Sequence, residues 1–559
     1  MENREDLKSI LPYLPLVIRS SSLYWPPRVV EALKAMSEGP SHSRVDSGEV
    51  LWQAISDMRR SLSLSNTLLA PSASQGYAFL FDELIHDKES KRWFDEIIPA
   101  ISGLLLRFPS LLEVHFQNAD SVVSGIKTGL RLLNSQQAGI VFLSQELIGA
   151  LLACAFFCLF PVSNRGAKDL PVINFDNLFA SLYESYSESH ESKIRCIMHY
   201  FERVCSSLPT GTVSFERKIL PAEYHNSSTT SPEADIWSKS DVSLCAFKVH
   251  SSGLIEDQSN NALEVDFANK YLGGGALNRG CVQEEIRFMI NPELIAGMLF
   301  LPRMDDNEAI EIVGAERFSC YTGYASSFRF AGNYIDKKAM DSFKRRRTRI
   351  VAIDALCAPK MRHFKDICLL REINKALSGF LNHRISWQHQ NIFIDKGDNE
   401  IQLASNDIVS GLLHTETTAS HGAPLNDVET DREKPASNLV RDFCVEGADC
   451  MDHENVGIAT GNWGCGVFGG DPELKAMIQW LAASQARRPF ISYYTFGLQA
   501  LENLDQVTKW ILSHEWTVGD LWNMMLEYSA QRLYKHTNLG FFSWLLPSLA
   551  ATNEAIWPS

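Results

Sequence analysis

The sequence predicts a protein in two parts: an all-α first part, and a second part of the α/β class with a mixed central sheet. Up to about Pro209, apolar residues recur at three- and four-residue spacing, as they do along one face of a helix. From about residue 236, short runs rich in β-branched and aromatic residues alternate with helix-like segments. This alternation is typical of layered structures with a parallel or mixed sheet.

The chain length also favours more than one domain, because 559 residues exceed the size at which one hydrophobic core stops growing. We predict a helical accessory domain over residues 1–209, a connecting segment over 210–235 and an α/β domain over 236–559. The connecting segment contains the Ser/Thr-rich stretch HNSSTTSPEAD. Residues 411–438 have little apolar content and much Thr, Asp and Glu, so we expect a mobile insertion there.

The longest apolar run of the first part extends from Leu147 to Phe160 and is too short to cross a bilayer. It predicts a buried helix. The amino-terminal stretch MENREDLKSILPYLPLVIRS carries acidic residues and lacks the basic region and apolar core of a signal peptide. We therefore expect a soluble protein that is not secreted and has no membrane partner.

Six short runs predict strands in the second part: LCAFKVHSS, LEVDFA, AIEIVGA, TRIVAIDAL, VGIAT and FISYYTFG. Helices are predicted in NPELIAGMLF, ICLLREINKALSGFL and DPELKAMIQWLAASQ. In sheets of this class ligands bind at the carboxyl ends of strands, so we expect the functional residues in the loops that follow the strands.

Composition excludes several functions. The formal net charge of -15 argues against a surface that coats nucleic acid, because such binding depends on Lys and Arg. The 12 cysteines form no CxxC pair and no His/Cys ligand spacing, so we predict no metal site and a reducing compartment. A polyanionic ligand is compatible with this charge only where local backbone N–H groups attract it.

Two glycine-rich turns follow predicted strands. The first contains Gly273, Gly274 and Gly275; the second contains Gly461, Gly464, Gly466, Gly469 and Gly470. After the second turn, Asp471 as N-cap and Pro472 at the first helical position predict a helix start. Bare backbone and a helix N-terminus favour an anion, so we predict a diphosphate site. The alternative is a pair of tight turns without a ligand.

The second turn also matches G-x-G-x-x-G, but the match alone is weak. A dinucleotide-binding site needs an acidic residue about 20 residues later to hold a ribose. That region here is QARRPFISYYTFG and contains none. This argues against an NAD-dependent oxidoreductase. The turn also lacks the GK[ST] ending that a P-loop requires, so it is not a P-loop.

Three carboxylates flank the first glycine turn: Asp266 before it, and Glu284 and Glu285 after it. The apolar residues that follow alternate as in a strand, and in a strand these adjacent glutamates would point to opposite faces. Only one would then carry a proton. Glycoside cleavage needs an acid and a base, and crowded buried carboxylates have raised pKa values. The alternative is that both glutamates are solvated or paired with Arg279 or Arg287.

Five aromatic residues near these loops are candidates to sandwich a base: Tyr321, Tyr324, Phe468, Tyr494 and Phe496. Each of them alone is typical of a core residue.

The stretch GGGALNRGCVQEEIRF resembles the signature of the poly(ADP-ribose) glycohydrolases. Several other segments resemble that family in the same order: LSQELIGALLACAFFCLFP, GTVSFER, VDFANKYLGGG, YTGYA, IVAIDAL and ATGNWGCGVFGGD. The likeness spans Leu143 to Gly497 and is greatest to the plant and animal enzymes.

The resemblance implies a macrodomain-like catalytic core behind the helical accessory domain. It implies hydrolysis of the ribose–ribose O-glycosidic bonds of poly(ADP-ribose), which releases ADP-ribose and removes this modification in the DNA damage response. Poly(ADP-ribosyl)ated proteins would be the partners of a monomeric enzyme that needs no cofactor or metal. The alternative is a macrodomain-type reader that binds ADP-ribose without cleaving it.

Carried residue by residue, the resemblance implies that Glu285 is the catalytic acid and that Glu284 holds ribose hydroxyls. Asp266, Asn269 and Gln283 would orient the substrate and the carboxylates.

For the rest of the substrate, the resemblance implies that both glycine loops cradle the diphosphate. Tyr324 would stack on adenine and Phe468 would wedge near the ribose. The second aromatic wall would be Tyr494 or Phe496.

The basic run KRRRTR, residues 344–349, has three interpretations: a nuclear import signal, a contact for polymer phosphates, or a charged turn before a strand. We expect the protein in the nucleus, the cytoplasm or both.

Overall fold

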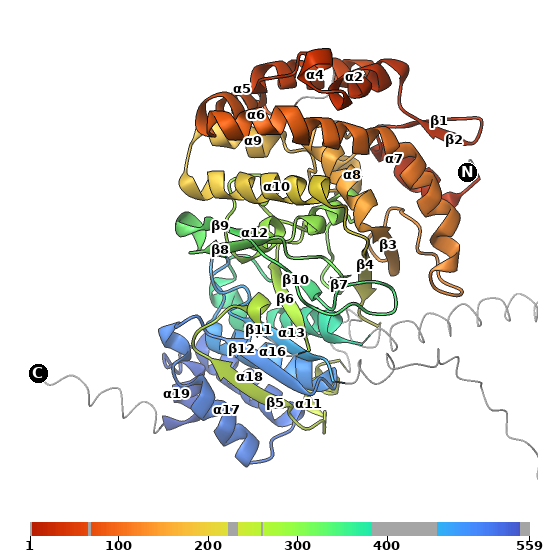
Figure 1. Ribbon diagram of the computed structural model, residues 1–559. Coiled ribbons are helices and arrows are strands. Elements are labelled where there is room, and N and C mark those ends of the chain that lie inside the picture. The colour runs from red at the N-terminus through yellow and green to blue at the C-terminus, as the bar shows by residue number, and fades with distance from the viewer. Residues whose placement is uncertain (1–2, 65–68, 222–232, 259–260, 383–454, 548–559) are drawn as a thin grey trace, which may run out of the picture. The chain divides into compact units, whose positions relative to one another are not determined.

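The computed structural model describes residues 3–64, 69–221, 233–258, 261–382 and 455–547. Within them, the main element is an eight-stranded mixed sheet with helices on both faces (Figure 1). The predicted insertion at 411–438 and residues 222–232 of the predicted connector lie outside the described residues.

Strand order and direction divide the sheet into two halves. The strands run in the order β3 (Gly139–Ser144), β4 (Thr212–Ile219), β7 (Glu308–Val313), β10 (Arg349–Asp354), β6 (Ala262–Ala268), β11 (Gly457–Gly461), β12 (Phe490–Tyr494) and β5 (Ala246–His250). Pairs from β3 to β10 are antiparallel, and pairs from β10 to β5 are parallel. The carboxyl ends of the parallel strands therefore meet at one edge.

The six predicted strands of the second part are confirmed as β5, β6, β7, β10, β11 and β12. The prediction of a helical first part is confirmed in its main elements, but residues 1–209 are not helical throughout: β3 is an edge strand of the main sheet, and β1 (Val17–Arg19) and β2 (Ser22–Tyr24) form a small hairpin. β3 leads directly into the next helix, so its short apolar run merges with the helical pattern in the sequence. β4 likewise lies inside the predicted connector and belongs to the sheet.

The helices of the first part are α1 (Glu5–Ile10), α2 (Pro27–Ser37), α3 (Pro40–Ser43), α4 (Gly48–Ser61), α5 (Ala73–Ala78), α6 (Asp87–Arg92), α7 (Ile98–Asn118), α8 (Gln145–Phe156), α9 (Asp176–Glu184) and α10 (Glu188–Ser206). The helix predicted in the run from Leu147 to Phe160 is confirmed as α8, and its side chains are buried. Ser144 caps it by accepting a hydrogen bond from the Leu147 N–H.

One continuous helical stretch, Asp87–Ser121, is long and apolar enough to cross a membrane by length and composition alone. Its side chains Ile101, Leu105, Phe108 and Leu112 are buried in a hydrophobic core that they share with residues of the other helices of the first part. This packing is typical of the core helix of a globular domain.

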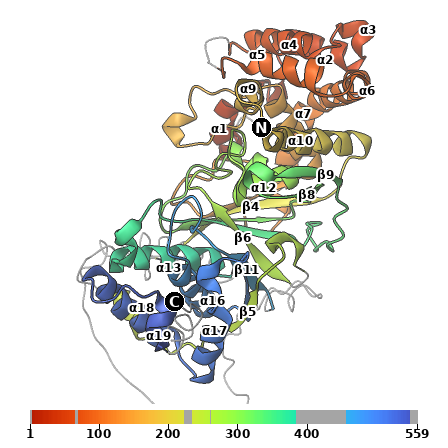
Figure 2. The same ribbon diagram turned by 90° about the vertical axis from the view of Figure 1, so that its left-hand side faces the viewer.

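The helices of the second part are α11 (Glu233–Ser238), α12 (Gln283–Ile290), α13 (Asp366–Phe380), α16 (Pro472–Gln485), α17 (Leu504–Ser513), α18 (Val518–Leu533) and α19 (Phe541–Leu545). Short strands β8 (Ser319–Thr322) and β9 (Arg329–Asn333) form a separate hairpin, and Pro292–Leu299 is a 3-10 helix. Figure 2 shows α10 and α12 on one side of β6 and β11, with α13 and α16 on the other.

Each face of the sheet has its own core, because successive side chains of a strand point to opposite faces. In β10, Ile350 and Ala352 belong to the core shared with the first part and α12, whereas Val351 and Ile353 belong to the core with α13 and α16. The accessory helices therefore pack in the same core as α12, which begins at the predicted catalytic glutamates.

Candidate functional site

The functional loops meet at the carboxyl edge of the parallel strands. β6 is followed by residues 273–280, here called the first glycine loop, and β11 is followed by residues 464–470, the second glycine loop. β12 lies beside β11 and is followed by Phe496. Strand order thus places the two loops and this aromatic side chain at one edge of the sheet, where ligands bind in this class of fold.

The segment after the first glycine loop is a helix, α12, and the strand suggested by its apolar alternation is wrong. Glutamates in a first helical turn are stabilised by the helix dipole, and Glu285 accepts the N–H of Val282 at 2.8 Å. The apolar residues alternate because the helix is buried on all sides: Ile286 and Ile290 share one side of it and Phe288 lies on another, and all three are buried. Adjacent residues on a helix lie about 100° apart, so both glutamates can reach the same loop.

Backbone N–H groups hold both glutamates. Glu284 accepts from the N–H of Gly273 at 2.7 Å and of Asn269 at 2.8 Å. Glu285 accepts from the N–H of Gly275 at 2.9 Å, in addition to Val282. Their side chains are 3% and 7% exposed. These are two oriented carboxyl groups in a buried site.

The alternative, solvated or arginine-paired glutamates, is wrong. Both are buried, and the two arginines have other partners: Arg287 pairs with Glu264 at 2.5 Å, and Arg279 pairs with Glu184 at 3.1 Å.

The glycines of the first loop are required by the glutamates themselves. Gly274 has φ +48°, and a Cβ there would lie 2.5 Å from Glu284 Oε2 and 2.8 Å from Glu285 Oε1. The N–H groups of Gly273, Gly274 and Gly275 donate to Glu284, to the Tyr271 carbonyl and to Glu285. The prediction that these N–H groups cradle a diphosphate therefore differs from the structure, in which they already have acceptors.

Asp266 lies at the end of β6 and is 1% exposed. Among the described residues, neither of its carboxylate oxygens has a hydrogen-bond partner. Burial raises the pKa of Asp266 to about 8; Arg287 opposes this shift and Glu285 adds to it. Burial, with Asp266 and Glu285 nearby, also raises the pKa of Glu284 well above its usual value, although its backbone hydrogen bonds oppose the shift. Protons therefore remain on this group of carboxyls at neutral pH.

Gln283 and Asn269 connect the glutamates to the end of β6. Gln283 accepts from the Phe267 N–H at 2.9 Å and donates to the Val265 carbonyl at 3.0 Å, which fixes the start of α12 against the strand. Asn269 donates its N–H to Glu284 and accepts from the Tyr271 N–H at 3.0 Å. Both positions fit the predicted orienting role.

The second glycine loop has open backbone donors. Among the described residues, the N–H groups of Gly466, Val467 and Phe468 have no acceptor within the protein. Gly466 and Val467 are exposed. Consecutive free N–H groups form a concave anion site, so this loop fits the predicted diphosphate cradle.

The backbone of the second loop depends on its glycines and on the helix that follows. Gly464 has φ +72°, and a Cβ there would lie 2.5 Å from the Ala355 Cβ; Gly469 has φ +65°. The helix start at Asp471 is confirmed, since its side chain accepts from the Leu474 N–H at 3.1 Å.

Lys475 is a residue that sequence reasoning missed. Its buried Nζ lies under the second glycine loop, paired with Glu372 and 3.7 Å from the centre of the Trp463 ring. A Cβ at Gly464 would be 3.2 Å from this nitrogen. A lysine in the first turn of a helix after a glycine loop is the signal that points to it, but it lies within an apolar helix pattern that hides it.

The aromatic candidates divide by exposure. Tyr324 is 55% exposed and Phe496 45%, and Phe468 is half-buried. Tyr494 is buried, and its ring stacks on His250 with centroids 4.7 Å apart. Phe496 lies over the end of β11, because a Cβ at Gly461 would be 2.8 Å from its ring. Of the two candidates for the second aromatic wall, Phe496 is the one open to a ligand.

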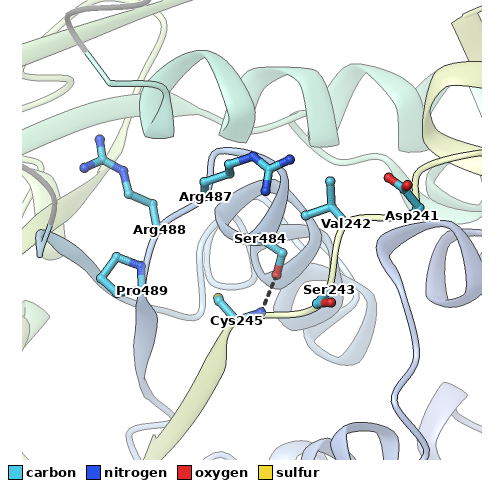
Figure 3. Close-up of a pocket in the computed structure, with 8 residues that line it drawn as sticks. All are labelled: Asp241, Val242, Ser243, Cys245, Ser484, Arg487, Arg488 and Pro489. Atoms are coloured by element: carbon cyan, nitrogen blue, oxygen red, sulfur yellow. Dashed lines mark hydrogen bonds between the residues drawn. The ribbon is translucent and has the colours of Figure 1, made fainter.

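A cavity of about 430 Å³ lies at the opposite edge of the sheet (Figure 3). Cys245 and Pro489, which line it, immediately precede β5 and β12. Arg488 donates to the carbonyls of Phe380 and Val456, so its guanidinium is committed to the backbone. The predicted catalytic carboxylates, Asp266, Glu284 and Glu285, do not line this cavity. The predicted catalytic site therefore belongs to the other edge of the sheet, at the carboxyl ends of the parallel strands.

Within the described residues, no group of three or more His, Cys, Asp or Glu side chains is placed to hold a metal ion.

Two family models match the chain. Residues 234–503 match the macrodomain-fold catalytic domain of poly(ADP-ribose) glycohydrolases, and residues 85–217 match the helical domain of the same family.

Two named plant relatives cover all or nearly all of the chain, and a nematode relative covers part of it. Poly(ADP-ribose) glycohydrolase 1 of Arabidopsis thaliana is 84% identical over 100% of both chains. Probable poly(ADP-ribose) glycohydrolase 2 of the same plant is 54% identical over 98% of this chain and 100% of its own length. Poly(ADP-ribose) glycohydrolase 1 of Caenorhabditis elegans is 30% identical over 60% of this chain and 35% of its own.

Proposed function

The chain belongs to the poly(ADP-ribose) glycohydrolase family, and we infer that it hydrolyses the ribose–ribose O-glycosidic bonds of poly(ADP-ribose) and releases ADP-ribose. The observation that carries this function is the pair of buried glutamates, Glu284 and Glu285, each held by two backbone N–H groups beside a glycine loop. Such a pair supplies one fixed carboxyl group that can carry the proton and a neighbouring one that can bind the ribose.

In the proposed reaction, Glu285 gives its proton to the departing ribose oxygen as the glycosidic bond breaks. The carboxylate that results takes a proton from a water molecule, and the water oxygen bonds to the oxocarbenium-like carbon. Glu285 is then protonated again, so protons and bonds balance over the cycle. Its two backbone hydrogen bonds fix the direction of the carboxyl group.

The remaining groups bind and orient. Glu284, whose pKa is raised mainly by burial, holds ribose hydroxyls. The free N–H groups of the second glycine loop hold the diphosphate, and the buried Lys475–Glu372 pair supports the loop beneath them. Tyr324 and Phe496 contact the base and ribose, and half-buried Phe468 lines the same edge.

The deciding experiment is hydrolysis of labelled poly(ADP-ribose) in EDTA and without NAD, with products separated by chromatography. We expect free ADP-ribose from the wild type. Glu285→Gln should lower kcat by roughly 10²- to 10⁴-fold, the range for a general acid–base group, with an unchanged Tm. If Glu285→Gln retains full activity while folded, the assignment of the acid is wrong.

A matched control is Glu293→Gln, because burial raises the pKa of Glu293 to about 8 and a neutral amide resembles its protonated form. Glu293 contacts Gln145 and the Glu316 N–H rather than the glycine loops. We expect the kcat of Glu293→Gln to stay within about twofold of the wild type, as for substitutions outside the catalytic site.

Polymer bound by the wild type without cleavage would instead support the reader function.

We also propose poly(ADP-ribosyl)ated proteins as the natural substrates of a monomeric enzyme in the nucleus, the cytoplasm or both, with no membrane partner and no sequence-specific binding of nucleic acid. For the basic run at 344–349, contacts support the charged-turn interpretation: Arg345 pairs with Asp341 at 2.7 Å and Arg346 with Glu316 at 3.1 Å. A fluorescent fusion carrying Lys344→Ala should therefore keep the wild-type distribution. Light scattering tests the monomer.

A further inference from the structure

Lys193 connects the accessory helices to the first glycine loop. It lies on α10, within the first part of the chain, and its side chain has no exposed surface. Its Nζ donates to the carbonyls of Asn278 and Gly280 at 2.5 Å and of Gly275 at 3.3 Å. One ammonium group thus gathers three carbonyls of a single loop.

Within the part of the chain that the structure describes, the hydrogen bonds donated by the Lys193 ammonium group all go to carbonyls of the first glycine loop. A buried ammonium needs compensation for its lost water, and an ammonium group has three donors. Here three backbone carbonyls supply the compensation. Burial lowers the pKa of Lys193 to about 8, while Cys281 and Glu285 act to raise it. The cation faces the same loop as the catalytic glutamate.

The loop that Lys193 holds is the one that orients Glu285. Gly275 donates its N–H to Glu285 and offers its carbonyl to Lys193, so one residue contacts both. Gly280 packs against the same carboxylate, since a Cβ there would lie 2.7 Å from Glu285 Oε1. Movement of this loop by a few tenths of an ångström therefore changes the position of the proton carrier.

Helix α9 contacts the outer side of the same loop. Ser181 donates to the Asn278 side chain at 3.2 Å, and Glu184 pairs with Arg279 at 3.1 Å. Arg279 and Glu184 are about half exposed, so their pair contributes little, and the buried Lys193 is the main attachment.

We propose that Lys193 is a positioning residue for the hydrolytic reaction: from the accessory helices it fixes the first glycine loop so that the Gly275 N–H holds the Glu285 carboxyl in its reactive orientation. This assignment rests on the proposed function of the same site. It gives the accessory part a direct role in catalysis, through three hydrogen bonds.

The test is Lys193→Met, which keeps an unbranched side chain only one heavy atom shorter and removes the charge and the donors. We expect kcat for poly(ADP-ribose) hydrolysis to fall roughly 100-fold, the cost of a misplaced reacting group. The Kd for ADP-ribose should stay within about threefold, because the second glycine loop and Phe496 are untouched. A wild-type kcat, or a Kd that weakens as much as kcat falls, overturns the proposal.

A merely structural lysine provides the matched control. Lys218 on β4 is also buried; it pairs with Glu311 at 3.1 Å and donates to the carbonyls of Gly379 and Leu381 at 2.7 and 2.6 Å, and none of these partners belongs to the glycine loops. Lys218→Met should lower the Tm and leave the kcat of the folded protein unchanged. If Lys218→Met lowers kcat as much as Lys193→Met, general destabilisation explains both and the proposal fails.

A double mutant separates action through Glu285 from an independent effect. If Lys193 acts through Glu285, adding Lys193→Met to Glu285→Gln should lower the residual kcat by less than threefold, because the two changes remove one shared function. A further 100-fold loss would show an independent effect and overturn the proposal.

If Lys193→Met does not fold, Lys193→Gln decides, since an amide keeps two donors without the charge. A kcat at least fivefold below the wild type with unchanged Kd for ADP-ribose supports the proposal, and a kcat within twofold overturns it. The wild-type assay run in parallel separates failure of this proposal from failure of the proposed function. No hydrolysis by the wild type refutes the proposed function itself.

Discussion

The two glycine loops have similar compositions and opposite uses of their backbone. In the first loop, the N–H groups of Gly273 and Gly275 are donated inward to Glu284 and Glu285. In the second, the N–H groups of Gly466, Val467 and Phe468 have no acceptor in the part of the chain that the structure describes. Glycines in the first loop make room for carboxyl groups of the protein, whereas those in the second leave donors for a ligand.

The charges beneath the loops differ in the same way. The first loop has two buried carboxyls, Asp266 and Glu284, whose pKa values are raised mainly by burial, and the nearby Arg287 is paired with Glu264. Beneath the second loop, Lys475 pairs with Glu372, and Asp354 pairs with Lys375. Excess buried carboxyl groups suit proton transfer, and a balanced ion cluster suits rigid support of a ligand site.

The largest expected contrast comes from one methyl group placed in each loop. Gly274→Ala forces a Cβ within 3 Å of both glutamates at φ +48°, so kcat should fall roughly 100-fold through displacement of the reacting group. Gly466→Ala meets no protein atom within 4 Å and leaves the glutamates in place, so its loss should fall on the Kd for ADP-ribose, with kcat within about twofold of the wild type. Steady-state hydrolysis of poly(ADP-ribose) measures both, with Tm recorded for each variant. Equal losses would contradict the comparison.

The next contrast concerns the aromatic residues at the end of β12. Phe496→Ala should weaken the Kd for ADP-ribose by about 5- to 100-fold, since stacking contributes roughly 1–3 kcal/mol per base. Tyr494→Leu should lower the Tm, because the buried Tyr494 ring stacks on His250, and should leave the Kd of the folded protein unchanged. Calorimetric titration with ADP-ribose distinguishes them. A larger loss of affinity in Tyr494→Leu would reverse the assignment of the aromatic wall.

Much of this architecture could be predicted from the sequence. The alternation of strands and helices predicted every strand of the parallel half, and Asp471 with Pro472 predicted the start of α16. These features are local, because β-branched runs, capping residues and proline act within a few residues of themselves.

The rest depends on contacts between residues far apart in the chain. The apolar residues that follow the α12 glutamates alternate as in a strand, and only burial on all sides of this helix explains that pattern. The acceptors of the glycine N–H groups are 10 or 11 residues away. Lys193 is more than 80 residues from the loop that it holds, and no local signal marks such a contact.

The smallest contrast is in the dependence of stability on pH. Burial raises the pKa of Asp266 to about 8. Between about pH 4 and 8, the folded state therefore holds a proton on Asp266 that the unfolded chain has already released. Stability is therefore lost as pH rises through this window, by at most about 1.4 kcal/mol per pH unit for one group. Asp266→Asn removes this contribution and should flatten the slope between pH 5 and 8.

Asp354 should behave in the opposite way. Burial alone would raise its pKa, but the charges of Lys375 and Arg371 lower it below its usual value. Its stabilising contribution is present above about pH 4 and is lost as pH falls through the folded pKa. Asp354→Asn should flatten the acid limb and leave the slope between pH 5 and 8 as it is. Urea unfolding from pH 3.5 to 8 measures both variants. If Asp266→Asn keeps the wild-type slope of the unfolding free energy above pH 5, Asp266 does not hold a proton in the folded state. The two loops would then not differ in the protonation of the buried carboxyl groups beneath them.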